Sequence, residues 1–297
     1  MYMITKLLTY GAQGKIYKAK PKEDITTESV VIKTIEITEK TLNDIVDEIT
    51  VMKTLSSQSN PYVVRYIHDY KVIADKKSYH YIVMEDLTSW INLDQYMKKL
   101  RKNNPCSRIH PDCLKVIITN LLKGLAYIHS QGIVHKDIKP ENIMIDDNYN
   151  VKYIDFGLSS ISNPDGTKGT PLYFPPETPI FFNDSTKAPP DLSPEEISNY
   201  RKEKGQKHDI WSLGLVIYQI TNLSRYPENL PFDFSNTGDI YSFMRMLRKQ
   251  PIKYPSQYLY EYGYSGLDFN KIISMMLSFD PSIRPTAAIL LEYISTT

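Results

Sequence analysis

The stretch His135-Lys-Asp-Ile-Lys-Pro-Glu-Asn142, followed by Asp155-Phe-Gly157, determines how the rest of the sequence is interpreted. Its carboxylates, amide and lysine stand in two short segments separated by Ile143–Ile154, which has the pattern of a β-hairpin. Carboxylate and amide oxygens suit Mg²⁺, an aspartate can accept a proton, and a lysine can stabilise a phosphoryl group during transfer. Because this combination is improbable by chance, the sequence predicts a phosphoryl-transfer site.

Two weaker patterns lie nearer the amino terminus. Gly11-Ala-Gln-Gly14 joins two strand-like runs. Its glycines would let the backbone present N–H groups to phosphates, although for two glycines taken alone an ordinary β-turn is the favoured interpretation. Lys33 ends the apolar run Val30–Ile32, and Glu48, beside the apolar face of the next helical segment, is its obvious partner. Taken in isolation, the pair is better explained as two solvated charges.

The apolar pattern changes along the chain. Up to about residue 86 it is typical of strands, with one helical pattern at Thr38–Ser56. The strand-like runs are Ile4–Thr9, Ile16–Ala19, Val30–Ile37, Val63–Tyr66 and Tyr79–Met84. Beyond residue 87, Leu114–Ile128 and Ile210–Ile220 are apolar on nearly all sides, as buried helices are. We predict an α+β fold with two lobes: a small β-rich lobe with one main helix, and a larger, mainly α-helical lobe. The lobes would join near Glu85–Leu87, with a ligand cleft between them.

Residues 181 to 208 interrupt the helical lobe with a polar segment that is Pro-rich at its start. Within it, Ser193-Pro-Glu-Glu196 has the composition of a capping box, with serine at the N-cap, proline at the first helical position and glutamate at the third. Gly205 can end such a helix. The sequence therefore predicts a short surface helix from Pro194 to Lys204.

Taken in order, these segments resemble a eukaryotic-type protein kinase of the serine/threonine class, over nearly the whole chain from Leu8 to Arg284. The resemblance extends to Gly169–Glu177, which is similar to the family segment that ends in Ala-Pro-Glu. It also includes Asp209–Gly214, similar to the signature of a buried helix of the larger lobe. In this family Arg284 would be the ion-pair partner of Glu177. Thr170 and Lys139 resemble the serine/threonine class in particular.

The resemblance implies a role for each matched residue. Asp137 would accept or orient the proton of the substrate hydroxyl, and Lys139 would stabilise the moving phosphoryl group. Lys33, held by Glu48, would contact the α- and β-phosphates. The expected ligands of Mg²⁺, with Mn²⁺ as an alternative, are Asn142 and Asp155. The residues expected to bind ATP are Leu8, Gly11, Gly14, Ile16, Val31, Lys33, Met84, Glu85, Leu87 and Met144.

The chain departs from the family pattern at several positions. Thr9 stands where the first glycine usually stands, and Val31 replaces the usual alanine over the adenine. Lys136 stands where many kinases have an arginine that grips an activation-loop phosphate in two places. The loop Leu158–Lys168 is short and therefore has less entropy to lose on ordering. Its remaining candidate phosphorylation sites are Ser159, Ser160, Ser162 and Thr167. We predict activity that is largely independent of phosphorylation in this loop.

The resemblance divides the chain into residues 1–86, with the glycine loop, Lys33 and the helix that carries Glu48, and residues 87–297, which include the insertion at about 181–208. Together they would form one protein kinase domain that transfers the γ-phosphoryl group of ATP to serine or threonine of protein substrates. A pseudokinase scaffold is the alternative, which the complete set of catalytic residues disfavours. A small-molecule kinase of related fold is another, against which Gly169–Glu177 and Arg284 argue.

Composition limits the partners. The 297 residues are 41% hydrophobic and 23% charged, an ordinary globular composition. Lys and Arg minus Asp and Glu give 35 − 34 = +1, so no global charge favours nucleic acid or anionic lipid. The six histidines lack metal-ligand spacing, and the two cysteines, Cys106 and Cys113, suit a reducing compartment. Neither a signal peptide nor an apolar run of roughly 20 residues is present. We expect a monomer in the cytoplasm, with the nucleus left open, that binds neither nucleic acid nor membrane.

Overall fold

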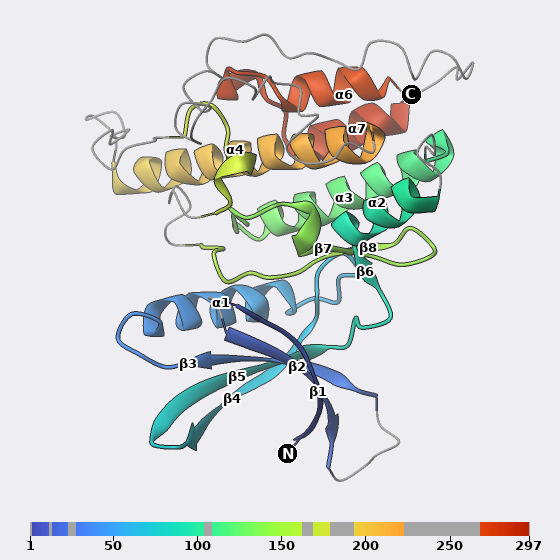
Figure 1. Cartoon of the computed structure of the whole chain (residues 1–297). Coiled ribbons are helices and arrows are strands. Elements are labelled where there is room, and N and C mark those ends of the chain that lie inside the picture. The colour runs from blue at the N-terminus through green and yellow to red at the C-terminus, as the bar shows by residue number, and fades with distance from the viewer. Residues whose placement is uncertain are drawn as a thin grey trace, which may run out of the picture.

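The computed structural model describes residues 2–11, 14–22, 28–103, 109–161, 169–178, 193–222 and 268–296. Two parts lie one above the other, a twisted sheet with one helix and a larger assembly of helices (Figure 1). The predicted α+β fold with a small β-rich part and a larger helical part is confirmed. The chain passes between the two parts at the end of the sheet, immediately after Glu85.

The amino-terminal part is built on a five-stranded antiparallel sheet of order β1-β2-β3-β5-β4. Its strands are β1 (Tyr2–Gly11), β2 (Gly14–Pro21), β3 (Val30–Glu36), β4 (Tyr66–Ala74) and β5 (Lys77–Glu85). β3 lies at the centre and is buried along most of its length. The predicted strand Val63–Tyr66 is wrong. β4 begins only at Tyr66, because Val63 is buried and bridges to Tyr153 in the other part.

Helix α1 (Leu42–Leu55) lies between this sheet and the carboxy-terminal part (Figure 1). Its buried stripe contains Ile45, Ile49 and Met52 at helical spacing, as the sequence pattern predicts. Glu48 is buried in the same stripe, although a lone carboxylate there would be costly. The fold therefore requires a partner for Glu48, and the partner comes from β3.

The carboxy-terminal part consists mainly of helices. They are α2 (Leu93–Asn103), α3 (Pro111–Ser130), α4 (Pro194–Asn222), α6 (Phe269–Met276) and α7 (Ala287–Thr296). A small sheet, β6 (Ile91–Asn92), β7 (Ile143–Ile145) and β8 (Val151–Tyr153), lies on the side that faces the amino-terminal part (Figure 1). Buried residues of α3 and of the second half of α4 form the core. Across the described ranges, no helix combines the length and apolarity needed to cross a membrane.

The surface helix predicted over Pro194 to Lys204 begins as expected but does not end there. The Ser193 hydroxyl accepts from the Glu196 amide at 3.3 Å, and the Glu196 carboxylate accepts from the Ser193 amide at 2.8 Å, so the capping box is present. The helix then continues through Gly205 as one element of 29 residues. A helical glycine costs only about 1 kcal/mol relative to alanine, which the burial of later turns outweighs. Residues 179–192, the start of the predicted insertion, lie outside the described residues.

Candidate active site

A cleft of about 870 Å³ lies between the two parts of the molecule. Of the residues predicted to bind a nucleotide, those that line the cleft are Leu8, Ile16, Val31, Lys33, Met84, Glu85, Leu87 and Met144. Of the predicted catalytic and metal-binding residues, Glu48, Lys139, Asn142 and Asp155 line it as well. An apolar end near Val31 and Met84, which pair across β3 and β5, therefore adjoins a charged end near Lys33 and Asp155.

The predicted glycines, Gly11 and Gly14, close the hairpin between β1 and β2, and neither is among the described residues that line the cleft. Gly14 has a φ of +117°, and a Cβ there would lie 2.1 Å from the carbonyl oxygen of Thr34. Only glycine fits that backbone. A Cβ added at Gly11 would meet no atom within 4 Å. The geometry of the hairpin thus requires Gly14, while the two residues at its tip lie outside the described ranges.

Lys33 connects the sheet, helix α1 and the second of the two decisive segments. Its ammonium donates to Glu48 at 2.6 Å and to Asp155 at 3.1 Å. Lys33 and Glu48 are each only 4% exposed. Burial alone would lower the pKa of Lys33, but the charges of Glu48 and Asp155 outweigh it and raise that pKa. Lys33 is therefore a fixed cation at the charged end of the cleft.

Asp137 is buried and is not among the described residues that line the cleft, but it is the centre of a hydrogen-bonded group whose other members, Lys139, Asn142 and Thr170, do line it. Its carboxylate accepts from Thr170 at 2.6 Å and from Asn142 at 2.9 Å, and it lies 2.8 Å from the ammonium of Lys139. Lys139 also donates to the Thr170 hydroxyl at 2.8 Å. Burial would raise the pKa of Asp137, yet the bonds from Lys139 and Thr170 lower it. The carboxylate is thus kept ionised, and ready to accept a proton.

Helix α4 holds the loop that carries Asp137. The buried Asp209 carboxylate accepts from the backbone amides of His135 and Lys136 at 2.8 and 2.9 Å, and from the His129 ring at 3.0 Å. Burial would raise the pKa of Asp209, but His129 and the loop lower it. Lys136 has a φ of 68°, an unusual conformation for a residue with a side chain. The two hydrogen bonds from these backbone amides to Asp209 stabilise that turn and hold the next residue, Asp137, beside Lys139 and Asn142 of the cleft.

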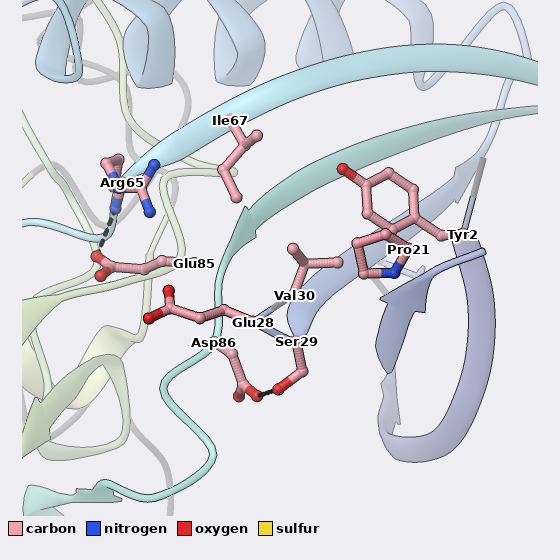
Figure 2. A pocket seen from close by; sticks show the side chains of 9 residues that line it. All are labelled: Tyr2, Pro21, Glu28, Ser29, Val30, Arg65, Ile67, Glu85 and Asp86. Carbon is pink, nitrogen blue, oxygen red and sulfur yellow. Dashed lines mark hydrogen bonds between the residues drawn. The ribbon is translucent and has the colours of Figure 1, made fainter. Parts of the chain in front are cut away.

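The segment that joins the two parts begins at Glu85, whose side chain is held by two hydrogen bonds. The Glu85 carboxylate accepts from the Arg65 amide at 2.7 Å and from Lys152 of β8 at 2.5 Å. Figure 2 shows the bond from Arg65 to Glu85, and beside it the Ser29 hydroxyl donating to Asp86. Arg65, Glu85, Ser29 and Asp86 line a second cavity of about 490 Å³, which lies at the start of β3. Glu85 lines both cavities, and its backbone amide also donates to the carbonyl of Arg65 at 3.0 Å, so its backbone and side chain are both held by Arg65.

A bidentate ion pair between Arg284 and Glu177 holds the segment that follows Thr170. Arg284 donates to the two Glu177 oxygens at 2.5 and 2.7 Å, joining the segment after Thr170 to the end of the helical part. The arginine side chain is fully buried, whereas that of Glu177 is 21% exposed. Arg284 also donates to the carbonyl of Ser278 and lies over the ring of Trp211 at 4.9 Å. The predicted pairing of Glu177 with Arg284 is present in the structure.

Several residues that line the cleft were not predicted from the sequence. Thr9, Thr88, Trp90 and Glu141 lie there without having been assigned to the site. Thr88 accepts from Lys18 of β2 at 2.6 Å, a contact that only the folded sheet reveals. For Thr9, the signal was its place in the glycine loop, where a glycine is usual.

The comparisons with known proteins agree with this geometry. The family "Protein kinase domain" matches residues 2–293. The chain is 31% identical to a probable serine/threonine-protein kinase nek2 of Dictyostelium discoideum, over 98% of the chain and 62% of that protein. It is 31% identical to CBL-interacting protein kinase 2 of Oryza sativa subsp. japonica, over 95% of the chain and 55% of the relative. It is 28% identical to CBL-interacting serine/threonine-protein kinase 8 of Arabidopsis thaliana, over 97% and 55% respectively. The chain thus spans roughly 55–62% of these relatives.

Proposed function

The chain belongs to the protein kinase domain family, and on that premise we propose that it transfers the γ-phosphoryl group of ATP to serine or threonine hydroxyls of protein substrates. The serine/threonine class is supported by the names of the relatives. It is also supported by Thr170, which joins Lys139 to Asp137.

One observation carries the proposal. A buried, ionised Asp137 carboxylate is bonded to Lys139, Thr170 and Asn142, and these three residues line the same cleft as the buried Lys33–Glu48 pair. A base and two cations around one cleft match the demands of phosphoryl transfer, in which catalysis is mainly positioning and charge stabilisation.

The residues present fit a nucleotide with a bound magnesium ion. Asn142 and Asp155 bring an amide and a carboxylate to the charged end, and the Asp155 side chain is 33% exposed. In the part of the chain that the structure describes, no group of three or more His, Cys, Asp and Glu side chains could hold a metal unaided. Mg²⁺ in such sites is held by one or two carboxylates together with substrate phosphates, so this donor set is sufficient. When bound, the ion supplies positive charge against the phosphates.

The chain's own residues would divide the work as follows. Ile16, Val31 and Met144 sandwich the adenine, and the backbone of Glu85–Leu87 offers it hydrogen bonds. Lys33, held by Glu48, contacts the α- and β-phosphates. Asp137 orients the substrate hydroxyl and takes its proton.

Lys139 completes the arrangement, because it lies 2.8 Å from the Asp137 carboxylate and bears the charge that the moving phosphoryl group requires. The Thr170 hydroxyl fixes the two side chains relative to each other. This preorganisation means that little has to move as charge develops in the transition state.

The test is transfer of radiolabelled phosphate from ATP to mixed protein substrates by the native chain and by Asp137→Asn. Asp75→Asn, in the exposed turn between β4 and β5, is the matched control, because asparagine tolerates the φ of 49° found there. Transfer by the native chain and the control, but not by Asp137→Asn, supports the proposal. Nucleotide binding without transfer by the native chain would instead favour a pseudokinase scaffold. Transfer that survives Asp137→Asn would indicate a contaminating kinase.

The proposed partners are protein substrates and ATP, and we propose a cytoplasmic monomer that binds neither nucleic acid nor membrane. Near-zero net charge and low cysteine content support these assignments. A peptide array with all acceptor contexts would define the sequence that surrounds the phosphorylated residue.

A further inference from the structure

The strand that forms the edge of the cleft roof contains an irregularity at its end. Along β1, Leu7 pairs with Tyr17 and Thr9 pairs with Ile16, so Leu8 has no partner on β2. Neighbouring residues of a regular strand face opposite sides of the sheet. An extra residue breaks that alternation. As a result both Leu8 and Thr9 line the cleft.

Thr9 belongs to a row of roof residues that leads to the charged end of the cleft. Thr9 pairs with Ile16 on β2, and Ile16 pairs with Lys33 on β3. All three line the cleft. The apolar end lies along a different row, in which Val31 pairs with Met84. Thr9 therefore lies on the side of the roof where Lys33 presents its ammonium, rather than on the side of the apolar pocket.

The Thr9 side chain is available to a ligand. Among the described residues that line the cleft from β1, β2 and β3, only Thr9 and Lys33 have side chains that donate hydrogen bonds; the others are Leu8, Ile16 and Val31. Thr9 is exposed, and within the described ranges its hydroxyl makes no hydrogen bond to protein. A β-branched side chain on a strand has few rotamers, so the hydroxyl is partly preorganised.

We propose that the Thr9 hydroxyl donates a hydrogen bond to an oxygen of the ATP phosphate chain, which makes Thr9 a nucleotide-binding residue of this chain. The inference rests on the proposed function. Where the family pattern has glycine, only the backbone can contact phosphate, so the hydroxyl adds a donor. A hydrogen bond to a charged oxygen is stronger than one between neutral groups, and the phosphate chain is the charged part of the nucleotide.

The test measures dissociation constants for ATP with Mg²⁺, for ADP with Mg²⁺ and for adenosine. Thr9→Val removes the hydroxyl while keeping the shape, and Thr9→Ser keeps the hydroxyl. Thr5→Val is the matched control, because Thr5 lies on the same strand but bonds to the carbonyl of Lys18. We expect Thr9→Val to weaken ATP and ADP about tenfold. Adenosine binding should stay within about twofold, and Thr9→Ser and Thr5→Val should bind like the native chain.

Two results would overturn the inference while leaving the proposed function intact: equal ATP affinity of Thr9→Val and the native chain, or an equal loss for adenosine and ATP. The first means that the hydroxyl makes no contact, and the second that the substitution disturbs the roof or that the hydroxyl binds the nucleoside. Failure of the proposed function appears differently, as a native chain that neither binds ATP nor transfers phosphate. Equal melting temperatures of all variants establish that each is folded.

Discussion

The hydroxyl of Thr170 donates to the carboxylate of Asp137 across 2.6 Å, although 33 residues separate them in the chain. The same hydroxyl accepts from Lys139 at 2.8 Å, so three side chains form a closed triangle at the floor of the cleft. The backbone of the loop that carries Asp137 is held separately, by Asp209. Thr170 therefore orients the site without supporting its scaffold.

Thr170→Val should lower kcat about 100-fold, because Asp137 and Lys139 lose the hydroxyl that joins them. A displacement of catalytic groups by about 1 Å has an effect of that size. The KM for ATP should change little, since Thr170 lies on the acceptor side. Thr170→Ser should behave like the native chain, as should Thr54→Val on the exposed face of α1. Steady-state kinetics measures each value. A loss equally large in Thr170→Ser would contradict a role for the hydroxyl itself.

Lys33→Met should abolish transfer and also lower the free energy of unfolding by about 3–5 kcal/mol, because it leaves Glu48 as an unpaired buried carboxylate. Burial already raises the pKa of Glu48, and Lys33 is the charge that opposes this. The double variant Lys33→Met/Glu48→Leu should regain much of that stability while remaining inactive. Urea titrations and transfer assays separate the two effects. A stable, inactive single variant would show that water reaches Glu48.

Arg284→Ala should lower the free energy of unfolding by about 3–5 kcal/mol, because Glu177 loses its bidentate partner and the packing of the arginine against Trp211 is lost. The matched control is Lys77→Ala, which removes an exposed ion pair with Glu36. Pairs of that kind contribute only about 0–1 kcal/mol. Denaturant midpoints give both values. Native-like stability of Arg284→Ala with a raised KM for ATP would contradict the structural role.

His208 should make the protein less stable in acid. It is buried, with its ring edge-on to Phe174 at 5.2 Å, and burial lowers its pKa. Asp209 and Glu177 oppose that effect, whereas Arg284 and Lys136 add to it. The folded-state pKa thus lies below the ordinary value of 6.5, so the neutral ring contributes stability above pH 6.5 that is lost as the pH falls toward the lowered pKa.

Melting temperatures from pH 8 to pH 5 provide the measurement. The native chain should lose stability below pH 6.5 more steeply than His208→Leu does. His110→Asn, which removes an exposed histidine at the start of α3 but keeps a capping residue, should follow the native curve. Identical pH dependence of the native chain and His208→Leu would assign the acid sensitivity to other groups.

Phosphorylation of the loop Leu158–Lys168 should raise turnover less than about tenfold, or about 1.4 kcal/mol of barrier. Two of its candidate sites, Ser159 and Ser160, are buried at 3% and 4% exposure. The Ser159 hydroxyl donates to the carbonyl of His135. The others, Ser162 and Thr167, lie outside the described residues. Turnover of chain expressed with a phosphatase, compared with chain left to autophosphorylate, measures the gain. A larger gain would show that the loop is a switch.

The sequence could predict what is decided over short distances. The six residues from Asp137 to Asn142 form one short segment, in which the asparagine side chain donates back to the aspartate, so the spacing in the sequence already predicts the contact. Helix α1 could also be predicted from the sequence, because its apolar residues repeat at helical spacing on either side of Glu48. In both cases local spacing and final contact coincide.

Contacts set by the whole fold could not be read in this way. β4 has half-exposed residues on both faces, so it shows no alternation. Thr9 faces the cleft because Leu8 has no partner on β2. Strand pairing depends on two strands, so the sequence of β1 alone does not reveal it. Helix α4 passes through Gly205 because later turns are buried, a gain that the local preference of glycine does not reveal.

The uninterrupted course of α4 has a mechanical consequence. At 1.5 Å per residue the helix is a rod of about 43 Å, with exposed turns at one end and Asp209 farther along. The exposed turns and Asp209 therefore belong to one uninterrupted helix. Asp209 accepts from the backbone amides of His135 and Lys136. The outer turns are thus connected, through a single continuous element, to the loop that carries Asp137.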